Sequence, residues 1–321
     1  MQITAGIDIG GTNTTVGLVD PAGHILSSKT LPTATPGGAD EFVARIASVL
    51  NEESRQLAPD LTLSGIGGAS PAANMREGTI HRPANLPWGT IHIVRMLKQY
   101  FDFPVAILND SNASALGELH YGLAKKMKNF CVITLGTGLG AGIVVQGQLL
   151  QGETGVAGEL GHITFDPHGR ECGCGRRGCA ETYLSATGLC RTAFELAAQR
   201  TAPTRLRSIS YNDLSARKVF ELAREGDLIA CEAFDMTGMY LGRLLADVAA
   251  IFDPQAVIIT GGLANAGDLL LTPARKTFHT TVLDLHQGGV DILVSGLPDG
   301  QAAILGASRL VREMAMQNVL P

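Results

Sequence analysis

Four side chains between residues 158 and 181 have the types and spacing of a metal site. The candidates are one histidine and three closely spaced cysteines: His162, Cys172, Cys174 and Cys179. One imidazole and three thiolates form a soft set of four ligands, which suits tetrahedral Zn²⁺. Glycines between the cysteines permit the tight turns that bring sulfur atoms together: Gly173, Gly175 and Gly178. We therefore predict a structural zinc site in this segment, called the cysteine loop (158–181) below.

Two acids, Glu159 and Glu181, bracket these ligands. A site of three thiolates and one imidazole needs no carboxylate, so we expect both acids to serve a substrate. His162 has two ring nitrogens, and it either binds zinc only or contacts a substrate as well. His168 is a rival ligand, but it lies in a Pro-His-Gly turn and is expected to be an exposed loop residue.

A glycine turn follows the first apolar run of the chain. Residues 3–9 and 15–20 read as strands, and residues 10–14 (Gly-Gly-Thr-Asn-Thr) join them. The turn leads to a second strand and lacks the Gly-Lys-Ser/Thr sequence, which excludes a Walker loop and a dinucleotide fingerprint. Its backbone N–H groups can hold phosphate, and Asp8 at the strand end can orient Mg²⁺ or its waters. A plain hairpin with an aspartate at its lip is the alternative.

The same pattern returns later in the chain. Residues 133–145, with glycines at 136, 138 and 140, repeat the apolar–glycine–apolar pattern of residues 7–19. A third strand, residues 256–260, runs into Gly261 and Gly262, which we expect near the α-phosphate or adenosine of a nucleotide. Two strand–turn–strand units predict a duplicated architecture, with two lobes that face each other across a cleft.

Asp110 follows a short apolar strand, residues 105–108, and opens a helix at 111–119. An aspartate in this position serves either as a helix N-cap or as a catalytic group at the carboxyl end of a strand. Taken alone, the local pattern favours the cap. In the rigid loop 83–88, which carries the only tryptophan, Asn85 is the polar side chain available to a ligand.

The remaining elements follow from periodicity. Helical patterns begin with 40–57, where Asp40 is the expected N-cap, and continue with 90–101, 185–200, 218–224, 228–251 and 300–316. The other expected strands are 25–31, 64–69, 79–80 and 290–294. Residues 200–207 are expected as an exposed loop, and Asn265 or Asp268 as the cap of a helix that follows Gly262.

Composition narrows the class of protein. The chain has 321 residues, 45% of them hydrophobic and 17% charged, with a net charge of -5. The acidic balance argues against a nucleic-acid-binding surface, and there is no apolar run long enough to cross a membrane and no secretory leader. We therefore expect a cytoplasmic protein, in which the cysteine loop binds metal and forms no disulfides. The other three cysteines read as buried fillers: Cys131, Cys190 and Cys231.

Together these motifs resemble the ROK family of sugar kinases, repressors and related proteins, and within it the bacterial glucokinases. The matching stretches are 8–13 (Asp-Ile-Gly-Gly-Thr-Asn), 85–88, 109–113, 136–140 and the cysteine loop. The resemblance implies an actin-like ATPase fold, a duplicated RNase-H-like α/β fold with two lobes around a cleft. It places 1–117 and 301–321 in a small lobe and 118–300 in a large lobe.

The resemblance also implies roles for individual residues. Asp110 is the general base for the 6-hydroxyl of the sugar. The sugar readers, besides Asp110, are Asn85, Asn109, Glu159, His162 and Glu181. The first phosphate loop comprises Asp8, Gly10, Gly11, Thr12 and Asn13. The second comprises Gly136, Thr137 and Gly138, and the pair that borders the adenosine is Gly261 and Gly262. The family pattern commonly has glycine after the proline of the 69–74 loop, where this chain has Ala72.

The implied activity is ATP-dependent phosphorylation of the 6-hydroxyl of a hexose, glucose first, with Mg²⁺ bound alongside the nucleotide. The alternatives are another hexose or N-acetylhexosamine (mannose, fructose, allose, N-acetylglucosamine or N-acetylmannosamine), a sugar-binding protein without catalysis, and a sugar-responsive regulator. The family's repressors place a helix-turn-helix ahead of the first strand, and this chain reaches that strand at residue 3. The resemblance implies a homodimer or homotetramer.

Overall fold

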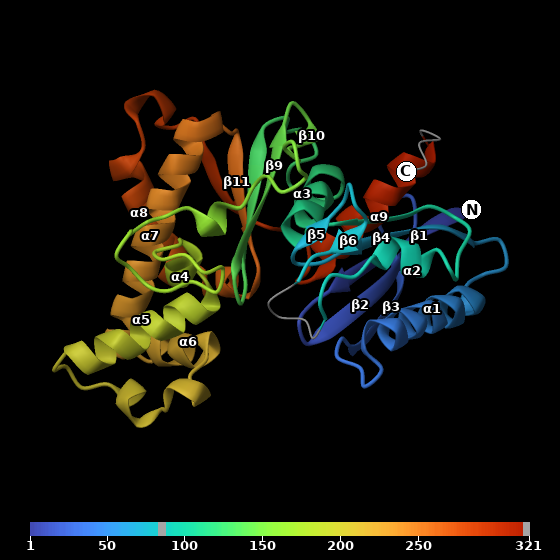
Figure 1. The fold of residues 1–321 in the computed structure, drawn as a ribbon. Coiled ribbons are helices and arrows are strands. Elements are labelled where there is room, and N and C mark those ends of the chain that lie inside the picture. The colour runs from blue at the N-terminus through green and yellow to red at the C-terminus, as the bar shows by residue number, and fades with distance from the viewer. Residues whose placement is uncertain (83–87, 317–321) are drawn as a thin grey trace. The chain divides into compact units, whose positions relative to one another are not determined.

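The computed structural model describes residues 1–82 and 88–316, which form two compact units (Figure 1). The first unit comprises residues 1–128, 142–158 and the segment from 295 onward, and the second comprises 129–141 and 159–294. The chain therefore passes from one unit to the other four times. The division into lobes at 117/118 and 300/301 remains a prediction.

The first unit is built on a five-stranded sheet in the order β3-β2-β1-β4-β7. Its strands are β1 (Gln2–Ile9), β2 (Asn13–Val19), β3 (Ile25–Pro32), β4 (Thr62–Ala69) and β7 (Val105–Leu108). β1, β2 and β3 pair antiparallel, as the glycine turn predicts, whereas β1, β4 and β7 run parallel. The carboxyl ends of β1, β4 and β7 therefore meet at one edge of the sheet.

Helices cover both faces of this sheet. They are α1 (Gly38–Gln56), α2 (Ile93–Leu97), α3 (Asp110–His120) and α9 (Gln301–Met316); a small hairpin, β5 (Ala73–Asn74) with β6 (Thr79–Ile80), precedes α2. Alternate residues of a strand point to opposite faces. In β1, Ile7 belongs to the core that α1 completes with Phe42, whereas the hydroxyl of Thr4 lies 2.7 Å from that of Ser308 in α9. The central strand is thus buried on both sides.

Glycines let α9 approach the sheet and α3 at backbone distance. A Cβ atom added to Gly67 of β4 would lie 1.8 Å from the carbonyl oxygen of Ala307, and one added to Gly306 would lie 1.8 Å from that of Ala113 in α3. Any side chain at either position would push α9 away. The last helix of the chain therefore sits where only backbone atoms fit.

The second unit repeats the sheet topology of the first. Its strands are β8 (Phe130–Leu135), β9 (Leu139–Val145), β11 (Ala256–Thr260) and β12 (Asp291–Val294), and β9 continues into the first unit, where its end pairs with β10 (Gln148–Leu149). The order β10-β9-β8-β11-β12 matches that of the first sheet, with β8, β11 and β12 parallel. The predicted duplication is confirmed.

Helices flank the second sheet: α4 (Glu181–Leu184), α5 (Ala186–Gln199), α6 (Ala216–Arg224), α7 (Leu228–Phe252) and α8 (Asp268–Thr281). α7 packs along α8 through its glycines, and a Cβ atom on Gly242 would lie 2.4 Å from the carbonyl oxygen of Ala274.

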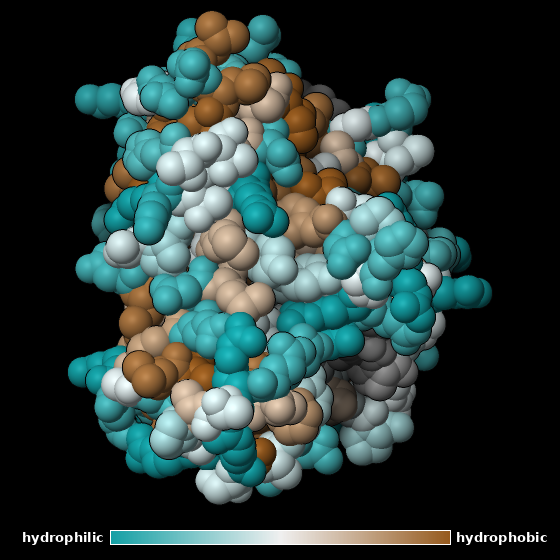
Figure 2. All heavy atoms as spheres, turned by 90° about the vertical axis from the view of Figure 1, so that its left-hand side faces the viewer, coloured by the Kyte–Doolittle hydropathy of each residue, from teal (hydrophilic) through white to brown (hydrophobic). Residues whose placement is uncertain are grey.

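Figure 2 shows that hydrophobic and hydrophilic residues are interspersed on the face of the molecule that it presents. Exposed apolar side chains of this unit include Ile251 and Leu285. Among the described residues, no helix has both the length and the apolar content that crossing a membrane requires.

Several local expectations were wrong. The N-cap of α1 is Gly37, so Asp40 lies inside the first turn of that helix. The N-cap of α8 is Gly267, and neither Asn265 nor Asp268 takes that position. The helix expected over 90–101 is limited to Ile93–Leu97, because the chain turns at 98–100 and buries Phe101. The 200–207 loop contains a buried residue, Leu206, at the start of a short 3₁₀ turn.

Gly67→Ala is expected to lower the free energy of unfolding by about 3 kcal/mol, the upper end for overpacking, because the carbonyl it meets cannot rotate away. Gly89→Ala is the matched control, since a Cβ atom there meets nothing within 4 Å, and its effect should stay within about 0.5 kcal/mol. Urea unfolding of both variants measures the difference. Equal stabilities would contradict the close contact between β4 and α9.

Candidate functional site

The first glycine turn has the geometry of an anion-binding loop. The backbone N–H of Gly10 donates to the carbonyl of Asn13 (3.0 Å), and the hydroxyl of Thr33 donates to the carbonyl of Gly10 (2.7 Å). These bonds hold the turn from inside, while its tip, residues 11–13, is exposed. A loop that is already fixed and exposed at its tip can accept a phosphate with little reorganisation.

Asp110 lies at the same sheet edge as this turn, because β1 and β7 run parallel and both end there. The helix N-cap beside it is Asn109, whose side-chain oxygen accepts from the N–H groups of Ser111 (2.9 Å) and Asn112 (3.3 Å). The local expectation that Asp110 serves as the cap was therefore wrong. Because Asn109 caps the helix, Asp110 is available for another role at the strand end.

Two carboxylates at this edge, Asp8 and Asp110, both have raised pKa values. Burial, and secondarily the charge of Asp110, raise the pKa of Asp8 from 3.8 to about 6. Burial also raises the pKa of Asp110, although a hydrogen bond from the N–H of Ser111 (2.8 Å) favours its carboxylate. Paired acids with raised pKa values are typical of cation-binding and proton-transfer sites.

The loop that follows β4 begins at the same edge of the first sheet and contains a strained residue, Ala72. Ala72 has φ +55°, in the left-handed region that favours glycine, and its carbonyl accepts from the N–H of His81 (2.9 Å). An alanine in this conformation costs about 1–2 kcal/mol. The loop keeps a shape that glycine would adopt freely. Asn85, the expected sugar reader in the next loop, lies outside the described residues.

Sequence reasoning missed two residues that anchor the segment before the cysteine loop. The side-chain amide of Asn74 donates to the carbonyl of Thr154 (3.2 Å), and the guanidinium of Arg76 donates to the carbonyls of Gly152 (3.0 Å) and Glu153. Nothing in the local sequence pairs residues about 80 positions apart. These contacts fix residues 152–154 to the β5–β6 hairpin of the first unit.

The cysteine loop brings its four predicted ligands together. The ligand atoms of His162, Cys172, Cys174 and Cys179 all lie within 4.8 Å of one another. The sulfurs of Cys174 and Cys179 are 3.7 Å apart, and Nδ1 of His162 is 3.7 Å from the sulfur of Cys172. Zn–S bonds of about 2.3 Å at tetrahedral angles put sulfurs roughly 3.8 Å apart, so the donor set fits zinc.

Turn geometry produces this convergence. Gly175 and Gly178 have positive φ angles, and a Cβ atom on Gly178 would lie 1.6 Å from the carbonyl oxygen of Asp166. Gly173, in contrast, has open space around it and an ordinary φ, so only two of the three predicted glycines are required. His168 is exposed, as expected, and is not among the four converging residues.

The two acids beside the loop differ in their surroundings. One carboxylate oxygen of Glu181 accepts from the N–H of Leu139 (3.0 Å), directly after the second glycine turn, and the other lies 3.8 Å from the sulfur of Cys172. Glu159 is exposed, and its carboxylate lies 3.9 Å from Nε2 of His162. His162 therefore points one nitrogen at the sulfurs and the other at Glu159.

The second glycine turn and the Gly261 turn share one edge of the second sheet. The N–H of Gly136 donates to the carbonyl of Gly138 (3.0 Å), and the hydroxyl of Thr187 donates to the carbonyl of Thr137 (2.9 Å). Gly261 has φ +93°, and a Cβ atom there would lie 2.6 Å from the carbonyl oxygen of Leu135. The two nucleotide-loop candidates of this unit are thus neighbours.

Comparison with known proteins agrees with this arrangement. The pattern of the ROK family matches residues 4–314. The chain is 35% identical over 319 residues to a glucokinase of Streptomyces coelicolor, covering 98% of each chain. It is 33% identical over 297 residues to an N-acetylmannosamine kinase of Escherichia fergusonii, covering 88% of this chain and 93% of that one.

A solved structure extends the likeness to three dimensions. The crystal structure of a ROK family glucokinase from Streptomyces griseus in complex with glucose and AMPPNP is similar with a TM-score of 0.81 and 34% identity, over 97% of this chain and 99% of that one. Fold and sheet topology place the chain among proteins with the two-lobe actin-like ATPase fold, as predicted. It belongs to the ROK family, which confirms the resemblance drawn from its motifs.

Asp8→Asn is expected to stabilise the fold at alkaline pH and not at acid pH. A folded-state pKa raised to about 6 means that ionisation above pH 6 costs stability, and that the cost disappears below the ordinary value of 3.8. After solvent screening of a half-buried group, the gain at pH 8 should be about 1–2 kcal/mol. Urea unfolding from pH 4.5 to pH 8.5 measures it.

Asp20→Asn is the control, because the pKa of Asp20 is shifted in the opposite direction to that of Asp8. Burial raises the pKa of Asp20, but hydrogen bonds led by those from His24 outweigh it, so the pKa is lowered overall. Its replacement should therefore leave stability unimproved at pH 8. A pH-independent effect of Asp8→Asn would contradict the raised pKa.

Proposed function

We propose that the protein is an ATP-dependent hexose kinase that phosphorylates the 6-hydroxyl of glucose. The observation that carries the proposal is Asp110. It is a half-buried carboxylate with a raised pKa at the carboxyl end of β7, on the sheet edge that also carries Asp8 and the first glycine turn. The relatives named glucokinase, and the relative bound to glucose and AMPPNP, support the choice of substrates.

The proposed chemistry begins with proton removal. A sugar hydroxyl has a pKa far above 7, so little alkoxide is present at neutral pH. Asp110 accepts the proton as the oxygen attacks the γ-phosphorus of ATP; the bond between the γ-phosphorus and the bridging oxygen breaks, and ADP leaves. A carboxylate whose pKa is raised by burial is a better base than an ordinary aspartate. General base catalysis of this kind contributes about 10²–10⁴ in rate.

The remaining catalysis is alignment and charge neutralisation. The turns at 10–13 and 136–138 present backbone N–H groups to phosphate, and Gly261 with Gly262 borders the adenosine. The carboxylates of Asp8 and Asp110 fit a divalent cation, because the charge of Asp110 raises the cost of ionising Asp8 and a cation would relieve that cost. Asp8 would hold Mg²⁺ or its waters, which neutralises developing charge on the phosphates when bound.

Sugar recognition falls to residues around the cysteine loop and β7. We assign hydroxyl contacts to Asn85, Asn109, Glu159, His162 and Glu181. Nδ1 of His162 faces the sulfurs, so Nε2 carries the proton when a metal is bound and can donate to a sugar hydroxyl. Glu181 already accepts one backbone N–H, which holds its carboxylate in place beside the cysteine loop. A carboxylate that is desolvated by the sugar and left without its hydroxyl partner would penalise the wrong sugar.

Zinc is the metal we propose for the cysteine loop. Four protein ligands leave no open position, so the metal is structural and supplies rigidity to the segment that carries Glu181. The reaction is proposed to take place in the cytosol, and the homodimer or homotetramer implied by the resemblance remains a prediction.

A second substrate, N-acetylmannosamine, is favoured by one observation, the similarity to the kinase of Escherichia fergusonii. The two readings differ at the 2-position of the sugar, where glucose has a hydroxyl and N-acetylmannosamine an acetamido group. Phosphorylation assays with glucose, mannose, fructose, allose and the two N-acetylhexosamines distinguish them. The highest kcat/KM is expected for glucose; a higher value for N-acetylmannosamine would replace the substrate and keep the mechanism.

Asp110→Asn is expected to lower kcat about 10²–10⁴-fold, because the amide cannot accept the proton. Glucose affinity should change less than about threefold, since the amide still accepts a hydrogen bond from the 6-hydroxyl. Coupled assays of ADP release and calorimetric glucose titration measure the two quantities. Asp102→Asn, an exposed acid of the same unit, should match the wild type. Near-normal turnover of Asp110→Asn would remove Asp110 as the base.

Elemental analysis should find about one zinc per chain, and Cys174→Ser should lose it. Glucose affinity of this variant should fall about 10–100-fold, because the loop that positions Glu181 and His162 loses its metal. Cys190→Ser is the matched control, since Cys190 is buried in α5 outside the ligand set. Active, glucose-binding protein without metal would contradict the structural zinc.

A further inference from the structure

A cavity lies in the second unit, on residues that the kinase mechanism does not use. Its volume is about 610 Å³. Its walls come from the turn 168–171 and Arg177 of the cysteine loop, from α4 and α5, and from Met236 and Tyr240 of α7. None of the proposed sugar or nucleotide residues lines it.

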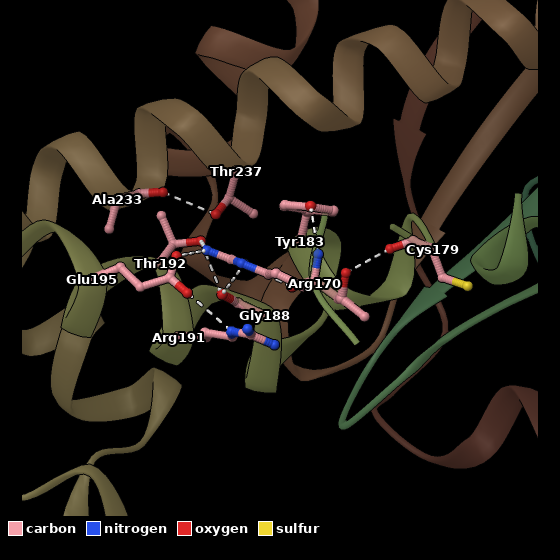
Figure 3. Close-up of polar contacts among 10 residues, drawn as sticks. Arg170, Cys179, Tyr183, Gly188, Arg191, Thr192, Glu195, Ala233 and Thr237 are labelled. Carbon is pink, nitrogen blue, oxygen red and sulfur yellow. Dashed lines mark hydrogen bonds and ion pairs between the residues drawn. The ribbon is translucent and has the colours of Figure 1, made fainter. Parts of the chain in front are cut away.

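One of the residues that line this cavity is an arginine, Arg170, whose guanidinium is held by several hydrogen bonds. The side chain of Arg170 is only 9% exposed, and its guanidinium donates to the carbonyl of Thr182 (2.7 Å). It also donates to the carbonyl of Gly188 (3.3 Å), the hydroxyl of Thr192 (3.0 Å) and the carboxylate of Glu195 (2.6 Å), as Figure 3 shows. Four acceptors fix the side chain in one orientation. The cavity is therefore shaped before any ligand enters it.

Cationic groups remain available at its rim. Arg191 uses Nε for Glu195 (2.9 Å), and no contact of its two terminal nitrogens is found among the described residues; Figure 3 shows its guanidinium end beyond that ion pair. Arg177 uses one terminal nitrogen for Glu171. Three arginines face two glutamates in the lining, Glu171 and Glu195, and both glutamates are paired. One positive charge is therefore left over, with free N–H donors.

The opposite walls are aromatic and apolar. The rings of Tyr183 and Tyr240 lie 4.9 Å apart, and the guanidinium of Arg170 stacks 4.6 Å above Tyr183. Met236 and Leu196 complete this side. Flat rings and a thioether accept a planar apolar group, while the guanidinium groups suit a phosphate by paired hydrogen bonds.

From this juxtaposition we propose that the cavity binds a small organic phosphate with a planar body, its phosphate on Arg191 and Arg177 and its body against Tyr240 and Tyr183. The site is independent of the proposed kinase activity. The turn 168–171 precedes Cys172 and Arg177 precedes Cys179 by two residues, so an occupant contacts the cysteine loop beside two of its proposed ligands without touching the ligands themselves.

Calorimetric titration of the full-length protein with phenyl phosphate tests the proposal. A ligand of this size that uses both walls should bind with Kd of about 1 mM or tighter. Arg191→Gln should weaken binding at least roughly tenfold, because it removes a charge-assisted contact. Tyr240→Leu should weaken phenyl phosphate several-fold and leave inorganic phosphate unchanged.

Arg217→Gln is the control. Arg217 forms the same kind of ion pair as Arg191, from Nε to a glutamate four residues on (Glu221, 3.0 Å), but it does not line the cavity. Melting temperatures of all variants verify that they fold. Absence of binding to the wild type at 10 mM ligand overturns the proposal, and so does equal affinity of Arg191→Gln and Arg217→Gln.

Discussion

Two carboxylates held at one sheet edge are the constraint on which the first unit depends. β1, β4 and β7 run parallel, so the turn after Ile9, the loop with Ala72 and the start of α3 all emerge on the same side. Burial disfavours the charges of Asp8 and Asp110, and the charge of Asp110 adds to the cost of ionising Asp8. The packing of α9 and α1 on the two faces of the sheet offsets this local cost. Local destabilisation of this kind, offset by packing elsewhere in the fold, is typical of a functional site.

The second unit couples its own features through Glu181. The carboxylate of this residue joins the second glycine turn, through the N–H of Leu139, to the surroundings of Cys172. A proposed phosphate-binding turn, a proposed sugar contact and a proposed metal ligand therefore lie close together around one carboxylate. A displacement of the cysteine loop would be transmitted to the turn through Glu181, so the proposed metal would influence the site without taking part in the reaction.

Much of this could be predicted from the sequence, because the decisive signals are local. Alternating apolar residues around glycines gave the strand–turn–strand units, and ligand types with short spacing gave His162 and the cysteines as one group. Asn109 and Asp110 were harder, since both residue types cap helices and only the structure shows which one does. Caps at Gly37 and Gly267 offer no side chain to recognise. The strain at Ala72 was visible only as an alanine where the family pattern commonly has glycine.

Other features could not be predicted because their partners lie far apart in the chain. Asn74 and Arg76 bind a segment about 80 residues later, and the cavity around Arg170 draws on three helices and a turn. No short pattern encodes such contacts. They depend on how the helices pack after they have formed. The sequence pattern shows which face of a helix is apolar, but it does not show which element packs against that face.

The position of α9 has a consequence for synthesis on the ribosome. The helix comes from the last residues of the chain, yet it fills the face of the first sheet that glycines such as Gly67 leave bare. The first strands to be translated therefore remain uncovered on that face until residues 301–316 have emerged. The second unit has by then been translated up to its last strand, so the domain begun first is completed last. An early ribosomal stall would leave a half-covered sheet, which is the kind of surface that chaperones bind.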